Sequence, residues 1–144
     1  MAQLLLDTNA LIWFETGRAM REEALLAIVG AQTAGTLFVS PITAWEAALA
    51  VRKKDPAKRP DLGGVDAASW FREARKRARA RLILIGSRIA LEVARVPAVF
   101  GHADPGDCFI IATAHVAKLA VVTRDRAVEA LAAAQPDYLD VVPC

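Results

Sequence analysis

The chain has 144 residues, enough for one ordinary domain with a sizeable buried core, and we treat residues 1–144 as a single domain. Hydrophobic residues make up 55% and aromatic ones only 6%, which argues against disorder and predicts a core of Ala, Leu, Val and Ile. The net charge of +2 is mild, and two cysteines are too few for a disulfide framework or a cysteine-rich metal site. We expect both thiols to be free.

Neither a membrane span nor a secretory leader is visible in the sequence. No apolar run approaches the roughly 20 residues that cross a bilayer. The N-terminus also lacks the basic start, apolar segment and cleavage site of a signal peptide. We therefore expect a cytoplasmic protein with no membrane partner.

The first short apolar run ends abruptly in polar residues. Leu4–Leu6 is followed by Asp7, Thr8 and Asn9, and apolar residues then resume from Ala10. This pattern predicts a buried strand, a tight turn and a helix. Asp7 would then lie at the carboxyl end of a strand, where open α/β sheets bind ligands. Capping of the following helix is the alternative role for the same side chain.

Helices and short strands alternate along the rest of the chain. Periodicity and turn residues predict helices over residues 21–34, 41–53, 66–79, 87–95 (ending near Pro97), 108–118 and 126–134, and strands over 37–39, 82–85, 119–123 and 138–142. Residues 55–64, rich in Pro and Gly, are predicted to form a loop. Strands separated by helices throughout predict an α/β fold with a parallel sheet covered on both faces.

One carboxylate falls inside a predicted apolar stripe. Ser40 and Pro41 are a typical N-cap and first residue for the helix over 41–53, whose expected buried stripe is Ile42, Trp45 and Leu49. Glu46 lies within that stripe, and burying an unpaired charge is costly. It is either functional or part of a capping box with Thr43.

Two further acids stand at one helix entrance. Asp104 is suited to be the N-cap and Pro105 the first residue of the helix that contains Cys108. Asp107 follows three residues after the cap, where the free amides of a helix start favour a carboxylate. Capping could explain either acid, but two are more than a cap requires. His102, in the preceding loop, is interpreted as a hydrogen-bonding rim residue without a catalytic role.

Basic residues gather in two stretches, which suit phosphate backbones or, equally, a solvated helix face. The first stretch contains Arg52, Lys53, Lys54, Lys58 and Arg59, and the second contains Arg72, Arg75, Lys76, Arg77, Arg79 and Arg81.

The acids could form one site. Asp125, like Asp7, follows a predicted strand, and the carboxyl ends of parallel strands share one edge. If Glu46 and Asp107 reach the same edge, four carboxylates repel one another and need a cation. Oxygen ligands without a His or Cys cluster favour Mg²⁺ or Mn²⁺ over zinc. Such a site suits hydrolysis of phosphodiester bonds.

Four segments in order resemble motifs of PIN-domain ribonucleases, and specifically of the VapC toxins of bacterial VapBC toxin–antitoxin pairs. The segments are Leu4–Asn9, Ser40–Glu46, His102–Ala114 and Val121–Asp125. Each motif is weak alone, whereas the ordered set, which extends over the whole chain, is specific.

The resemblance implies a three-layer α/β/α fold with a five-stranded parallel sheet and an Mg²⁺- or Mn²⁺-dependent endoribonuclease. Its catalytic and metal-binding carboxylates would be Asp7, Glu46, Asp107 and Asp125, with Asp104 as an accessory acid. The residues implied to orient them by hydrogen bonds are Thr8, Asn9, Ser40 and Thr123. The family also implies RNA as substrate, a homodimer, and a VapB-like antitoxin whose C-terminal segment blocks the site.

The chain departs from the family pattern at three positions. Gly106 and Cys108 stand where Phe and Arg are common around Asp107, and Ala50 stands where a Lys is common one turn after Glu46. The family pattern thus leaves substrate contacts and partner pairing less certain for this chain than metal binding.

Three other functions remain open. A phosphatase of the haloacid dehalogenase type would use Asp7 as nucleophile, but it needs an Asp where this chain has Asn9. A receiver-like signalling domain would need paired acids before the first helix and a Lys after the last strands, and neither is present. A PIN fold kept only as a catalytically silent binding module is the third possibility, against which the presence of all four acids argues.

Overall fold

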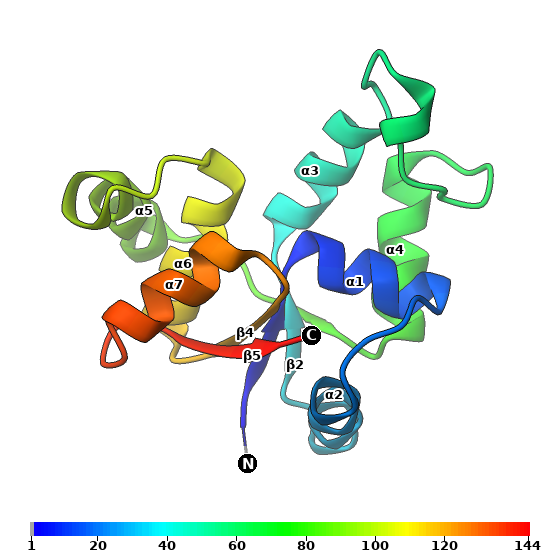
Figure 1. Cartoon of the computed structure of the whole chain (residues 1–144). Helices are drawn as coiled ribbons and strands as arrows, with labels where there is room; N and C mark the ends of the chain where they lie inside the picture. The colour runs from blue at the N-terminus through cyan, green and yellow to red at the C-terminus, as the bar shows by residue number, and fades with distance from the viewer. Residues whose placement is uncertain (1) are drawn as a thin grey trace.

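The computed structural model describes residues 2–144 and contains one five-stranded sheet in which every strand pairing is parallel (Figure 1). The strands are β1 (Leu4–Leu6), β2 (Leu37–Val39), β3 (Arg81–Leu82), β4 (Ala120–Thr123) and β5 (Asp140–Pro143). Their spatial order is β3-β2-β1-β4-β5, so the chain changes direction across the sheet at the central strand β1. The predicted α/β fold with five parallel strands is confirmed.

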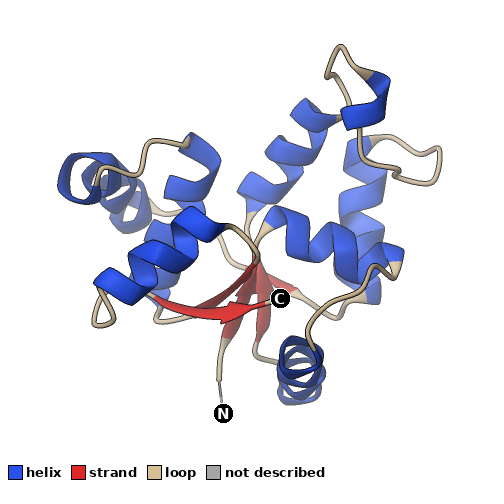
Figure 2. Ribbon diagram, viewed as in Figure 1, coloured by secondary structure: helices blue, strands red, loops and turns tan. Residues whose placement is uncertain are grey.

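The sheet lies between two groups of helices (Figure 2). In chain order the helices are α1 (Thr8–Thr16), α2 (Glu22–Ala34), α3 (Pro41–Ala50), the short 3₁₀ helix η1 (Pro56–Lys58), α4 (Ala67–Arg77), α5 (Ser87–Phe100), α6 (Pro105–Ala117) and α7 (Arg126–Ala134). Helices α1, α2 and α4 cover one face, and α5, α6 and α7 cover the other.

Alternation along β1 divides the core between the two faces. Successive side chains of a strand point to opposite faces of the sheet. Leu4 and Leu6 accordingly pack with α1, α2 and α4, whereas Leu5 packs with α5, α6 and α7, and all three are fully buried. Burial on both faces explains why β1 is an uninterrupted apolar run.

Helix α3 belongs to both halves of the core. Ile42 packs in the cluster on the α5–α7 side, and Ala47 packs in the cluster on the α1–α4 side. The predicted buried stripe was therefore wrong in part, because Trp45 and Leu49 are 47% and 48% exposed. The small residues Thr43 and Ala47 occupy the interior instead, which lets the helix lie close to its neighbours on both sides.

Several element boundaries also differ from the prediction: α3 ends at Ala50 instead of residue 53, and β5 covers Asp140–Pro143 instead of residues 138–142. Strand β3 covers only Arg81–Leu82 instead of residues 82–85, because its partner β2 ends at Val39 and offers nothing further to pair with. Helix α5 continues through Pro97 to Phe100. Pro97 is exposed, and the buried Val96 beside it packs in the apolar cluster that α5 shares with α6, so packing outweighs the hydrogen bond that proline cannot make.

The predicted loop and the predicted free thiols are confirmed. Residues 55–64 form an irregular connection apart from the 3₁₀ helix η1, and Gly35, which follows α2, is a left-handed C-cap with φ 73°. Both cysteines are free and buried. Within residues 2–144, no helix has the length and apolar character needed to span a membrane.

Candidate metal and active site

Asp7 and Asp125 lie at the carboxyl ends of neighbouring strands. Asp7 follows β1 and Asp125 follows β4, and the two strands pair directly through Leu6 and Val122. Asp7 also caps α1, since its Oδ1 accepts a hydrogen bond from the Ala10 amide at 2.7 Å. Asp125 likewise caps α7, with its Oδ1 accepting from two amides at 2.8 and 3.1 Å. Capping and placement at the sheet edge are thus compatible roles.

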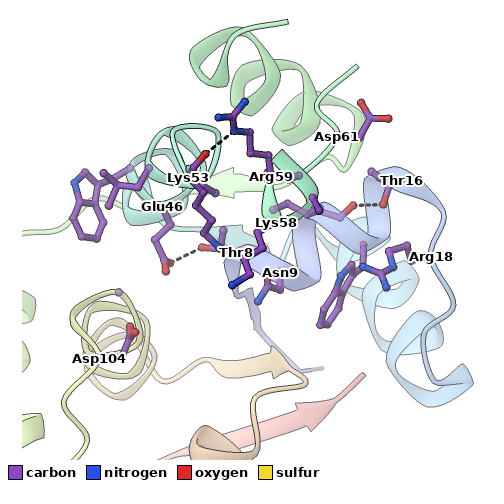
Figure 3. Close-up of a pocket in the computed structure, with 18 of the residues that line it drawn as sticks. Thr8, Asn9, Thr16, Arg18, Glu46, Lys53, Lys58, Arg59, Asp61 and Asp104 are labelled. Carbon is purple, nitrogen blue, oxygen red and sulfur yellow. Dashed lines mark hydrogen bonds between the residues drawn. The ribbon is translucent and has the colours of Figure 1, made fainter. Parts of the chain in front are cut away.

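Glu46 reaches the same region from α3. Its Oε1 accepts a hydrogen bond of 2.6 Å from the hydroxyl of Thr8, the residue after Asp7 (Figure 3). The hydroxyls of Thr8 and Thr43 lie 3.1 Å apart, which continues this network into the core. The alternative capping box was wrong, because Ser40 caps α3 and the Thr43 amide donates to the Ser40 carbonyl.

Asp107 and Asp104 stand together at the start of α6. Asp104 caps the helix by accepting a hydrogen bond from the Asp107 amide at 3.0 Å. The Oδ2 of Asp107 lies 2.9 Å from Nε2 of His102, whose side chain is only 10% exposed. The thiol of Cys108 donates to the His102 carbonyl, so the loop that carries the histidine is held in place. His102 therefore orients Asp107, a contact that no spacing rule in the sequence reveals.

The residues expected to orient the carboxylates differ in what they contact. Thr8 binds Glu46, and Thr123 accepts from the Asp125 amide at 3.0 Å and also hydrogen-bonds Asp7. Ser40 is fully buried and is used in capping α3, and Asn9 is exposed at the groove described below. Thr43 and His102, which were not in the expected set, take part instead.

The carboxylates raise one another's pKa. Burial raises the pKa of Asp7 to about 6, repulsion from Asp107 and Glu46 adds to the shift, and hydrogen bonds from Thr123 and Ala10 oppose it. Burial, followed by the charges of nearby acids, also raises the pKa of Glu46 and of Asp107, against the hydrogen bonds that each accepts. Among the described residues, no Lys or Arg forms an ion pair with any of these acids.

The donor set fits a hard divalent cation. The donors are carboxylate oxygens whose charges repel one another, and among the described residues no Lys or Arg pairs with them, which suits Mg²⁺ or Mn²⁺. The hydrogen bonds to Glu46, Asp107 and Asp125 each use one oxygen and leave the other available. Within residues 2–144, no three acidic, His or Cys side chains already surround a single point at coordinating distance, so cation binding would draw them together.

A groove of about 960 Å³ leads away from the acids (Figure 3). It begins at Glu46 and Asp104 and extends between α1 and α3 to the segment 57–61. Its basic lining residues are Arg18, Lys53, Lys58 and Arg59. The Nε of Arg59 donates to the Lys53 carbonyl at 2.7 Å, which holds the irregular segment against α3.

The second basic stretch lies elsewhere. It lines a shallow pocket between the end of α4 and β3, formed by Arg72, Arg75, Lys76, Arg79 and Arg81 among others. Arg81 contacts the carbonyl of Gly35, which precedes β2, so this pocket is at the amino edge of the sheet, opposite the acids. Of the two basic stretches, only the one around Lys53 and Lys58 adjoins the site.

Comparison with known families decides what kind of domain this is. The model of the PIN domain family matches residues 4–134, which is most of the chain and includes every acid described above. The chain belongs to the PIN domain family. Among individually curated protein sequences, none matches.

Solved structures share the PIN fold of this chain at low identity. A DNA-bound VapBC from Salmonella typhimurium has a TM-score of 0.66 and 17% identity over 99% of this chain and 98% of that one. VapBC2 from Rickettsia felis, bound to a promoter DNA fragment, has a TM-score of 0.65 and 12% identity over 98% of each chain. FitAcB from Neisseria gonorrhoeae has a TM-score of 0.57 and 22% identity over 96% of this chain and 95% of that one.

The raised pKa of Asp7 predicts a stability effect in metal-free protein. Because its pKa is about 6 in the folded state and about 3.8 in the unfolded state, the folded state binds more protons between these values. Stability should therefore fall as the pH rises from about 4 to 6. Asp7→Asn keeps the acceptor for Ala10 and removes the charge, so in EDTA at pH 7.5 it should stabilise the protein by about 1–3 kcal/mol.

Chemical denaturation at pH 4 and pH 7.5 measures this difference, which should vanish at the lower pH. Asp66→Asn is the matched control, because hydrogen bonds with Ser69 lower the pKa of Asp66, and the control should not gain stability. Equal stability of Asp7→Asn and the parent at pH 7.5 would contradict the argument.

Proposed function

We propose that this PIN domain is a divalent-metal-dependent endoribonuclease that hydrolyses RNA phosphodiester bonds as the toxin of a toxin–antitoxin pair. The observation that supports the proposal is that Asp7, Glu46, Asp107 and Asp125 lie near one another at the carboxyl edge of the sheet, where the charges of neighbouring acids add to the burial that raises the pKa of Asp7, Glu46 and Asp107. A cluster of acids with no Lys or Arg partner is unfavourable unless a cation and its anionic substrate complete it.

Some of these residues would bind the metal, and others would orient the metal-binding side chains. A bound Mg²⁺ or Mn²⁺ would polarise a phosphoryl oxygen and lower the pKa of a water molecule. Asp7, Glu46, Asp107 and Asp125 would hold it. Thr8 orients Glu46 through its hydroxyl, and His102 holds one oxygen of Asp107 so that the other faces the site. Such outer contacts fix ligand geometry before the metal arrives.

We infer that the RNA strand continues from the acids into the groove. The acids at one end of the groove would repel RNA phosphates unless a metal is bound. Further along the groove, Lys53 and Lys58 can attract the phosphates. The half-exposed indole of Trp45 also lines the groove and offers a surface on which an unpaired base can stack. These features support RNA with accessible bases as the substrate.

The proposed partners are a VapB-like antitoxin and a second copy of the chain, in the cytoplasm. Support for the antitoxin comes from the fold shared with proteins solved as VapBC and FitAB complexes. Support for pairing of two copies comes from large apolar residues left exposed on α5 and α3, among them Leu91, Val99 and Leu49.

One observation favours a second candidate, a PIN fold kept as a binding module. The acids in residues 2–144 do not already enclose a coordination point, which is what a domain without catalysis would also show. The two candidates differ in whether RNA is cut.

Cleavage of RNA should depend on both metal and acids. With Mg²⁺ or Mn²⁺ the protein should cut RNA, and EDTA should abolish cutting. Asp7→Asn, Glu46→Gln, Asp107→Asn and Asp125→Asn should each lower the rate by about 100-fold or more, since each removes a charge that holds the cation. Gel analysis of labelled RNA measures the rate, with Asp66→Asn as a surface control. Cutting that survives EDTA and Asp7→Asn would refute the metal mechanism, and binding without cutting would favour the binding module.

The groove predicts a second effect, on RNA affinity. Lys58→Glu should weaken RNA binding about 3- to 10-fold and make the salt dependence shallower by about one unit of slope, because one phosphate contact is lost. Lys76→Glu on α4, at the opposite edge, makes the same charge change and should have a smaller effect. Fluorescence anisotropy across a salt series gives both quantities, and equal effects of the two variants would exclude the groove as the RNA path.

The toxin role predicts an effect on cells. Expression of the chain alone should stop bacterial growth, while Asp7→Asn at the same protein level should not, because growth arrest would come from RNA cleavage. Growth curves with immunoblots measure this. Normal growth with active, soluble protein would leave the nuclease in place and rule out the toxin assignment.

A further inference from the structure

Gly106 lies in the first turn of α6, against the carboxylate of Glu46. The residue is buried, and a Cβ placed on it would lie 2.6 Å from Cδ and 3.0 Å from Oε1 of Glu46, and closer still to Oε2. Real Cβ atoms essentially never approach other heavy atoms within 3.0 Å. Among the described glycines it is the only one whose added Cβ would meet any atom within 4 Å.

The backbone does not require glycine at this position. Gly106 lies within a regular helix and is absent from the residues with positive φ. Glycine inside a helix costs stability relative to alanine, because it loses more conformational freedom on folding. Space for a neighbouring group is therefore the reason that the structure offers for a glycine here.

The Glu46 carboxylate, which lies against Gly106, is also held by Thr8. Oε1 of Glu46 accepts the 2.6 Å hydrogen bond from Thr8, so the carboxylate is confined between α1 and the start of α6. The groove, which both Glu46 and Gly106 line, is the open direction. A methyl group at position 106 would push the carboxylate toward the groove, away from Thr8 and from Asp107.

We propose that Gly106 is a positioning residue in this chain: Glu46 occupies the space that a side chain at position 106, commonly Phe in the VapC family, would fill, and this placement keeps its carboxylate bonded to Thr8 and near Asp7 and Asp107. This inference rests on the proposed function for its effect on catalysis, but the placement of Glu46 can be tested without it. The neighbouring acids repel Glu46, so its carboxylate stays in place only because Thr8 holds it and α6 leaves room for it.

Gly106→Ala separates this role from a structural one. The flexible end of Glu46 can move, so the variant should still fold. Its unfolding temperature should equal that of the parent or be slightly higher. Its Mn²⁺ affinity, measured by isothermal titration, should fall about 10- to 100-fold, and RNA cleavage at limiting Mn²⁺ should fall with it. Gly30→Ala is the matched control, because Gly30 lies inside α2 with nothing within 4 Å of its added Cβ, and it should bind Mn²⁺ as the parent does.

A double-mutant cycle tests whether the effect passes through Glu46. In a Glu46→Ala background the obstructed carboxylate is gone, so Gly106→Ala should no longer change Mn²⁺ affinity. An undiminished loss in that background, or unchanged Mn²⁺ affinity of Gly106→Ala in the parent, would overturn the proposal.

A crystal structure of Gly106→Ala supplies a readout that is independent of metal and activity. The Thr8–Glu46 hydrogen bond should be broken and the carboxylate displaced toward the groove. If the bond is retained, the positioning role is wrong even if the protein is a nuclease. If the parent binds no Mn²⁺ and cuts no RNA, the proposed function fails, while the crystal structure still decides whether Gly106 places Glu46.

Discussion

Mutual repulsion of carboxylates at the carboxyl edge of the sheet is the constraint around which this domain is arranged. Asp7, Glu46 and Asp107 all have raised pKa values, with burial as the largest cause and neighbouring acids adding to it. A fold that brings such groups together loses stability in the absence of a cation. The loss is tolerated because Leu4–Leu6 and the strands beside them bury apolar side chains on both faces of the sheet.

The acids come from four separate places in the chain, and each is held by its own contacts. Asp7 and Asp125 are the N-caps of helices that begin where neighbouring strands end. Asp107 is bound by His102, in a loop that the Cys108 thiol secures. Glu46 depends on Thr8 on one side and on the space left by Gly106 on the other. The site is thus held by rigid helix and strand ends, which limits how far each ligand can move.

Charge is distributed unevenly around the site. Negative charge is concentrated at the sheet edge, and positive charge begins beyond the end of α3, at Lys53 and Lys58. A polyanion approaching alone would be repelled at one end of the groove and attracted at the other. Under the proposed function, a bound cation would remove the repulsion, so metal and nucleic acid binding would favour each other. The basic surface of α4, at the opposite edge, takes no part in this arrangement.

Local patterns in the sequence determined the order of elements, the parallel sheet, the caps at Asp7, Ser40 and Asp104, and the choice of acids to examine. These depend on neighbours along the chain, such as a short apolar run that ends in a capping residue. Tertiary structure alone decided that Trp45 and Leu49 are exposed, that Pro97 lies within α5, and that Glu46 bonds Thr8 across 38 residues of sequence. It also decided which basic stretch adjoins the acids and that a side chain at position 106 would meet Glu46. The reason is physical: burial, helix continuation through proline and contacts between distant segments are set by packing partners, and their positions follow from topology rather than from local periodicity.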